Sequence, residues 1–178
     1  MKALSNSSDR YLQFFRITKY NPQFRNKQGA YKHEEWTSVY DIGKKFKGVE
    51  FTFDEYKHFE DAYIQAIFKI MDINMIENFI VEELEKYDFN PYPDFATNTE
   101  KYYKNLRNNQ IILKDELPIF FRLILREIIW CKFSNKLMVV HIGYDYNMYI
   151  GSAKSITHKL KEIMRLGLYV EQMKSPYI

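Results

Sequence analysis

The sequence contains little cysteine or glycine and has no long hydrophobic run. Its single cysteine, Cys131, cannot form an internal disulfide and lies in an apolar segment, which indicates a small buried hydrophobe in a reducing compartment. Its six glycines match neither the dinucleotide-binding nor the P-loop spacing. No apolar stretch reaches the length of a secretory signal core or of a membrane span. These absences predict a cytoplasmic protein with no membrane partner.

An excess of charge of one sign is also missing. Lysine and arginine number 26 against 23 aspartates and glutamates, and the basic residues are spread among the acids. Because nucleic-acid-binding proteins need a clustered basic face, we expect no nucleic-acid partner. The pattern Glu-x-x-His occurs once, at Glu55 and His58, whereas metal sites in helix bundles use this pattern twice. We therefore predict neither a metal nor a cofactor.

Aromatic side chains are abundant. The 15 tyrosines, 14 phenylalanines and 2 tryptophans make up 17% of the 178 residues. A chain of this length builds one well-buried core, and some of its rings are expected to remain on the surface. Exposed tyrosine and tryptophan favour interfaces because one end of the ring system is apolar and the other can form hydrogen bonds.

The hydrophobic pattern predicts an α+β fold. Thr52 begins a capped helix that runs to about Met71, and Asp115 precedes a second helix. The remaining expected elements are strands at 10–20, 75–87, 127–133, 137–150 and 168–173, short helices at 37–46, 100–108 and 155–166, and a long loop at 23–36. This order predicts a single domain over residues 1–178, with a mostly antiparallel sheet and helices packed on one face. Residues 1–9 are expected to form a disordered leader, and residues 88–99 are a possible connector between subdomains.

Polar residues interrupt the apolar run VVHIGYDYNMYIG at residues 139–151. In a strand, His141, Asp145 and Tyr149 project to one side, and their apolar neighbours project to the other. The Cα atoms of His141 and Asp145 would then lie about 13 Å apart, at ~3.3 Å per residue. A direct hydrogen bond between them is excluded in a regular strand, so we interpret these residues as the polar face of a sheet.

The long loop contains the sequence His33-Glu34-Glu35-Trp36. Loops often carry catalytic residues, and Glu34 or Glu35 could act as a general base if it were desolvated beside the tryptophan. Together with the His141 and Asp145 strand, this loop supports an alternative hypothesis, a small metal-independent hydrolase or nuclease.

Acidic and aromatic residues cluster through the middle of the chain. Such a mixture suits a docking surface for a basic partner better than it suits catalysis. We predict no catalytic residues, and the predicted partner-binding residues are Glu82, Glu83, Tyr87, Asp88, Tyr92, Asp94, Asp145 and Tyr149.

Four segments carry a resemblance to a known class of proteins: YLQFFRITKY at 11–20, EWTS at 35–38, WCK at 130–132 and GYDY at 143–146. With these segments the chain resembles small bacterial cytosolic proteins of the polymorphic-toxin immunity type, over most of its length. The resemblance implies a protein that binds and blocks one toxin domain, with no catalytic residues to transfer.

The first functional hypothesis is therefore a non-enzymatic protein-binding module, an immunity protein that neutralises a bacterial toxin domain. The hydrolase or nuclease is the alternative. A structural or regulatory homodimer that uses an aromatic sheet edge is a third hypothesis, which leaves both a monomer and a homodimer open.

Overall fold

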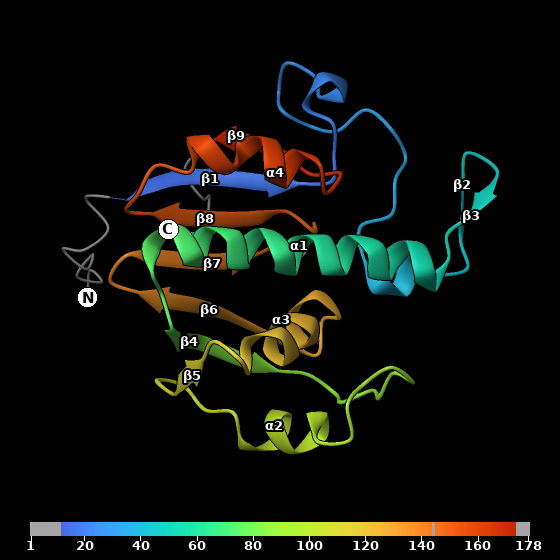
Figure 1. The fold of residues 1–178 in the computed structure, drawn as a ribbon. Helices are drawn as coiled ribbons and strands as arrows, with labels where there is room; N and C mark the ends of the chain where they lie inside the picture. Colours follow the sequence, from blue (N-terminus) through green and yellow to red (C-terminus); the bar gives the residue numbers. More distant parts are fainter. Residues whose placement is uncertain (1–11, 144, 174–178) are drawn as a thin grey trace, which may run out of the picture.

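A seven-stranded antiparallel sheet forms the centre of the computed structural model, which describes residues 12–143 and 145–173 (Figure 1). The strand order is β5-β4-β6-β7-β8-β1-β9, and a separate two-stranded hairpin joins β2 to β3. The strands are β1 (Gln13–Thr18), β2 (Lys45–Phe46), β3 (Val49–Glu50), β4 (Asn78–Lys86), β5 (Ile111–Leu113), β6 (Ile129–Asn135), β7 (Met138–Ile142), β8 (Met148–Ser152) and β9 (Tyr169–Gln172).

Helices cover one face of this sheet. Figure 1 shows α1, α3 and α4 on the same side of the sheet, while α2 lies beyond the β5 end. The helices are α1 (Phe53–Asn74), α2 (Thr99–Asn105), α3 (Leu117–Leu125) and α4 (Leu160–Met164), with short 3-10 turns at Pro22–Phe24, Val39–Asp41 and Thr157–Lys159. The prediction of an α+β fold with helices on one face of an antiparallel sheet is confirmed. The predicted leader at residues 1–9 lies outside the described residues.

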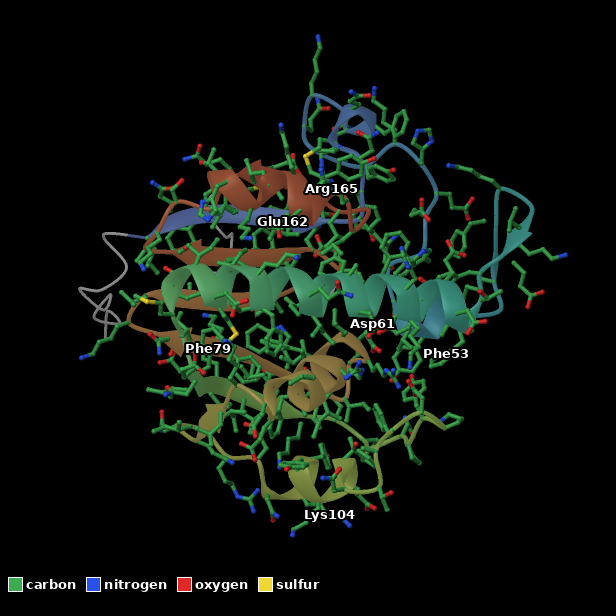
Figure 2. The ribbon with its side chains drawn as sticks, viewed as in Figure 1. Phe53, Asp61, Phe79, Lys104, Glu162 and Arg165 are labelled. Carbon is green, nitrogen blue, oxygen red and sulfur yellow. The ribbon has the colours of Figure 1, made fainter. Side chains whose placement is uncertain are left out.

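The long helix α1 is formed by local signals that the sequence shows. The hydroxyl group of Thr52 accepts a hydrogen bond from the backbone N–H of Glu55 and so caps the first turn. The helix ends where Met75 adopts a left-handed conformation with φ of 55°. Between these ends the buried side chains recur at helical spacing and pack on the sheet, as Tyr63 and Ile67 do. A salt bridge from Lys69 of α1 to Glu162 of α4 joins the two helices, and Figure 2 labels Glu162 on α4.

The expected strand at residues 137–150 is wrong, because the segment forms two strands. β7 and β8 pair with each other as antiparallel neighbours, and a turn with Asp145 lies between them. Inside the turn the backbone N–H of Gly143 donates to the carbonyl of Asn147, and a carboxylate oxygen of Asp145 accepts from the backbone N–H of Asn147. Asp and Asn form such turns through their side chains, a signal that the surrounding apolar residues obscured in the sequence.

The expected helix at residues 37–46 is also wrong. Ser38 and Asp41 form a capping box, but the turn that they begin is a 3-10 turn of three residues, Val39–Asp41. Gly43 follows with φ of 88°, which a right-handed helix cannot continue. The chain then enters the β2–β3 hairpin.

The segment at residues 88–99 packs against α1 and α3 instead of linking two subdomains. Arg126, at the end of α3, is fully buried and forms two hydrogen bonds to Glu60 of α1, at 2.6 and 2.7 Å. Its guanidinium also donates to both carboxylate oxygens of Asp94, at 2.7 and 2.9 Å, which holds the pKa of Asp94 well below its usual range. The guanidinium carbon lies 4.7 Å from the ring centroids of Tyr92 and Phe95. One buried cation therefore ties the segment to two helices.

Phe53 extends this cluster at the first turn of α1 (Figure 2). Its ring stacks on Tyr92 with centroids 6.3 Å apart and lies 5.5 Å from the guanidinium carbon of Arg126. Cation–π contacts of this kind are stronger where water is excluded. The predicted connector is therefore part of the same packed body as the helices.

We predict that Arg126→Met destabilises the protein by about 3–5 kcal/mol, because it leaves the buried carboxylate of Glu60 without its main partner. Removing both charges in Arg126→Met/Glu60→Leu is expected to cost less than the single substitution. Urea unfolding followed by tryptophan fluorescence measures both, and Arg165→Met, at an exposed arginine, is the control. A double variant less stable than Arg126→Met would contradict this reading of the pair.

Candidate functional site

A row of polar side chains crosses the face of the sheet that the helices leave uncovered. Strand pairing places each member opposite the next on the neighbouring strand, from β4 to β9. The alternate residues, such as Phe133 and Val140, are buried toward the helices, so this row faces the other way. Its members are Glu82, Lys132, His141, Tyr149, Arg16 and Glu171. The predicted polar face, with His141 and Tyr149 on one side, is present.

His141 is a packed member of this row and offers no accessible imidazole. It is 1% exposed, and its ring meets Trp130 edge-on at 5.0 Å and lies nearly parallel to Tyr149. Burial lowers the pKa of His141 to about 4, with a further lowering from nearby Lys132, so the ring is neutral at neutral pH. A general base must reach the proton that it removes, and this side chain is almost fully buried.

At the β1 end of the row lies an open hollow of about 400 Å³, which we call the arginine pocket. Three parts of the chain form it: the end of β1, the loop at residues 21–37, and the turn between β7 and β8. Its lining residues are Arg16, Tyr20, Arg25, Gly29, Ala30, Tyr31, His33, Glu35, Thr37, Asp145 and Asn147. The pocket therefore brings together His33 and Glu35 of the predicted loop site with Asp145 of the predicted strand site.

The loop at residues 21–37 is held by its own hydrogen bonds and ring contacts. A side-chain oxygen of Asn26 accepts from the backbone N–H groups of Gln28 and Ala30, and the chain folds back so that Arg25 and Tyr31 pair. The ring of Tyr31 then packs on Tyr20 with centroids 5.0 Å apart. These contacts hold the loop in place although it contains no long helix or strand. The sequence therefore shows no helical or strand periodicity in this segment.

Two arginines in the pocket share one carboxylate. Arg16 donates two hydrogen bonds of 2.9 Å to Glu171, in the bidentate geometry that arginine favours. The Nη2 atom of Arg25 lies 3.7 Å from the same carboxylate, beyond hydrogen-bond distance. Arg25 donates from Nη1 to the carbonyl of Gly29, while its Nε and Nη2 atoms are buried and have no hydrogen-bond partner within the described residues.

The turn between β7 and β8 contributes Asp145 and Asn147 to the lining of the pocket. The side-chain amide nitrogen of Asn147 donates to Asp145 at 2.6 Å, which orients both side chains. Asn147 is 4% exposed, and its Oδ1 atom has no hydrogen-bond partner among residues 12–143 and 145–173. Buried polar atoms are rarely left unpaired, so this oxygen is an exception to the usual pattern.

Lys19 lies beside the pocket, in a buried aromatic corner. Its Nζ atom is 3.8 Å from the ring centroid of Trp36, 4.1 Å from that of Tyr20, and 3.8 Å from Oε1 of Glu35. Burial lowers the pKa of Lys19 to about 7, opposed by the charge of Glu35. The amine therefore changes its charge near neutral pH, next to a carboxylate of the pocket wall.

The predicted partner-binding residues separate into three groups. The first group lies toward one end of the sheet. It contains Asp145, which lines the arginine pocket, Glu82 and Glu83 in β4, and Tyr87 and Asp88 directly after β4. Tyr92 and Asp94 contact Arg126 and so have a structural use. Tyr149 is 5% exposed, within the polar row, and offers little area to a partner.

Glu83 lies at an irregularity in β4. The register between β4 and β6 shifts between Glu82 and Glu85, and Glu83 adopts φ of 54°. This bulge brings its carboxylate to 2.9 Å from the ammonium group of Lys132. β-bulges re-aim side chains in this way, so the local charge at Glu83 is partly compensated.

Other kinds of site find less support in the described residues. No group of three histidine, cysteine, aspartate or glutamate side chains among residues 12–143 and 145–173 is arranged to hold a metal ion. Cys131 is buried, and burial raises the pKa of its thiol well above the usual range. Within the same part of the chain, no helix combines the length and the apolar composition that a membrane crossing needs.

Sequence reasoning missed Arg16, Arg25, Lys19 and Arg126. One signal was available for Arg16, because a charged residue in an otherwise interior strand requires a counter-charge. Nothing in the local spacing identifies Glu171 as that counter-charge, since 155 positions separate the two residues.

We predict that Lys19 makes stability depend on pH. Its folded-state pKa is about 7 and its ordinary value is 10.5, so between these pH values the unfolded chain binds a proton that the folded protein does not. Unfolding free energy therefore rises with pH in this window. Relative to Lys19→Met, the wild type is expected to gain about 2 kcal/mol between pH 7 and 9, at ~1.36 kcal/mol per pKa unit.

Urea unfolding at several pH values measures this difference, with Lys136→Met at an exposed lysine as the control. A constant difference between wild type and Lys19→Met across the window would show that Lys19 keeps an ordinary pKa.

Comparisons of the chain with protein-family models, with curated protein sequences and with solved structures gave no match. The geometry of the chain itself is therefore the basis for assigning a function.

Proposed function

We propose that this chain is a non-enzymatic protein-binding module of the immunity type, which binds a bacterial toxin domain and blocks it. The observation that carries the proposal is the arginine pocket: an open hollow on a firmly held loop, with hydrogen-bonding groups of Arg25 and Asn147 left unpaired within the described residues. Interfaces concentrate binding energy where an anchor side chain enters such a preformed pocket.

The surroundings of the pocket suit a protein surface. Tyr20, Tyr31 and His33 form an aromatic wall, in which the centroids of Tyr31 and His33 are 5.7 Å apart. Tyrosine offers a large contact area and a hydroxyl group at little cost in conformational entropy. Rigid aromatic walls around a hollow are therefore a favourable place for a partner's anchor residue.

Acidic residues at the same end of the sheet favour a basic partner. Asp88 is exposed, and Tyr87 is 38% exposed and donates to Glu85 from its hydroxyl group. Asp145 adds a carboxylate at the pocket. Complementary charges of this kind mainly increase the association rate and make it depend on salt.

A hydrolase or nuclease is the second candidate, and one observation favours it. Glu35 and His33 line the same pocket, and Glu35 lies 3.8 Å from the amine of Lys19. In this hypothesis Glu35 acts as the general base. His141 does not suit that role, because its imidazole is not accessible. Glu34, the other carboxylate of this loop, is exposed.

A homodimer is the third candidate. The edge strand β5 exposes Ile111 and Leu113 at 58% and 54%, next to Ile80 of β4. This edge is aliphatic, whereas the other edge strand of the sheet, β9, carries Tyr169. The β5 edge is three residues long, which limits the backbone pairing that it can offer.

The first proposal predicts that the chain rescues cells expressing the toxin domain encoded next to its own gene. Tyr31→Ala is expected to weaken the complex by about 2 kcal/mol or more, because it removes an aromatic wall of the pocket. Isothermal titration calorimetry with the purified toxin domain measures the loss. Tyr40→Ala is the matched control, since Tyr40 is 57% exposed and lies outside the pocket.

Equal losses for both tyrosine variants, with both still folded by circular dichroism, would place the interface elsewhere. Absence of both rescue and binding would contradict the immunity function. Hydrolysis of a nucleic acid or ester by the wild type that Glu35→Gln abolishes would establish the second candidate instead.

A further inference from the structure

A second open hollow, of about 290 Å³, lies beside α2 at the β5 end of the sheet (Figure 1), and we call it the amide pocket. Four of its residues belong to α2 and its N-cap, and the other two directly precede β5 and α3. The lining residues are Asn98, Lys101, Tyr102, Asn105, Gln110 and Glu116. Four strands separate β5 from β1, which contributes to the arginine pocket, so the two hollows are distinct.

Part of this lining is held in place by the protein itself. The Oε1 atom of Gln110 accepts a hydrogen bond of 3.0 Å from the backbone N–H of Arg107, which orients the side-chain amide. The half-buried ring of Tyr102 packs edge-on against Phe120 of α3, with centroids 5.7 Å apart. Groups that are already fixed lose less conformational entropy when a ligand binds.

Several polar groups of the lining keep their hydrogen-bonding capacity. Within the part of the chain that the structure describes, the side-chain amides of Asn98 and Asn105 form no hydrogen bond, and Asn98 does not cap α2. The Nε2 atom of Gln110 likewise has no acceptor among these residues. Asn98 and Asn105 are exposed and Gln110 is half-buried, so water or a ligand can reach these residues.

The composition of the lining selects the kind of ligand. One ammonium group, on Lys101, and one carboxylate, on Glu116, give the lining no net charge. Tyr102 is the one lining side chain with a large apolar surface, so an apolar ligand would cover the amides without replacing their hydrogen bonds. An amide group both donates and accepts, and so does a hydroxyl group. A neutral ligand with several hydroxyl groups therefore matches this lining.

We propose that the amide pocket binds a neutral saccharide through a single sugar ring. Its hydroxyl groups replace water on the amides of Asn98, Asn105 and Gln110 and reproduce the hydrogen bonds that water makes there. Its C–H groups lie against the ring of Tyr102, whose face carries partial negative charge. The volume of about 290 Å³ is near the lower limit for small-molecule sites, roughly 300 Å³, which suits one sugar ring.

This site goes beyond the proposed protein-binding function and does not depend on it. The toxin domain is proposed to contact the arginine pocket, which shares no lining residue with the amide pocket. Either activity can exist without the other, and the two are tested with different ligands.

The test follows the side-chain amide signals of the ¹⁵N-labelled full chain by nuclear magnetic resonance. D-glucose, D-galactose, D-mannose, D-xylose and N-acetyl-D-glucosamine are added in separate titrations. We expect the signals of Asn98, Asn105 and Gln110 to shift and saturate with at least one sugar, at the millimolar concentrations usual for so small a ligand. The signal of Asn90, an exposed asparagine outside the pocket, is expected to stay in place. Glycerol at the same concentration should cause no saturating shift.

Two variants assign the partners of the sugar. Asn105→Ala removes one amide, and Gln110→Glu keeps an acceptor for the N–H of Arg107 but replaces the amide donor by a carboxylate oxygen. Each substitution is expected to weaken binding of the tightest sugar by about threefold to tenfold, as for one lost hydrogen bond. Asn90→Ala is the matched control and should leave the affinity unchanged.

The titrations of the wild type decide the outcome even where a variant fails to fold. Absence of a saturable shift with all five sugars overturns the proposal. Shifts that glycerol reproduces at the same concentration also overturn it, and so does an affinity for sugar that both pocket variants leave unchanged.

Discussion

The arrangement at the β1 end of the sheet depends on how one carboxylate is divided between two arginines. Glu171 on β9 accepts both of its short hydrogen bonds from Arg16 on the neighbouring strand, and Arg25 remains at 3.7 Å. Antiparallel pairing fixes this choice, because Arg16 and Glu171 are directly opposite in the register of β1 and β9. The loop that carries Arg25 therefore closes over the sheet with a guanidinium that is only partly compensated.

The charge of a second buried arginine, Arg126, is fully compensated by its neighbours. Arg126 has hydrogen bonds to two carboxylates and aromatic rings around it, and no part of its side chain is exposed. Its role is to fasten residues 88–99 to the helices. Arg25 differs from Arg126 in its position and in its hydrogen bonds. It lines an open hollow, and two of its nitrogen atoms have no hydrogen-bond partner within the described residues. This contrast is why we assign a structural role to Arg126 and propose a binding role for Arg25.

The sequence predicted the parts of the fold that local signals encode. Thr52 and the helical spacing after it predicted α1, and the alternation around His141 predicted a sheet with a polar side. The turn at Asp145 and Asn147 was missed because apolar residues continue on both sides of them. Helical spacing at residues 37–46 was misleading because Gly43 needs a positive φ.

The candidate site was predictable only in fragments. Glu35 and Asp145 were both considered for the hydrolase or nuclease hypothesis, but as alternative sites on separate segments, because more than a hundred positions lie between them. Their meeting in one pocket follows from the pairing of β1 with β8 and from the turn that precedes β8. Local spacing in the sequence does not encode which distant strands pair. The ion pair between Arg16 and Glu171 could not be predicted for the same reason.

The most direct test of the claim that Arg25 is a binding group is a nuclear magnetic resonance titration of the arginine Nε–H signals. The spectrum of the ¹⁵N-labelled chain is followed as the toxin domain is added. We predict that the Arg25 signal shifts with the added toxin domain while the buried Arg126 signal stays in place. A titration that leaves the Arg25 signal unchanged at saturation would contradict the central claim.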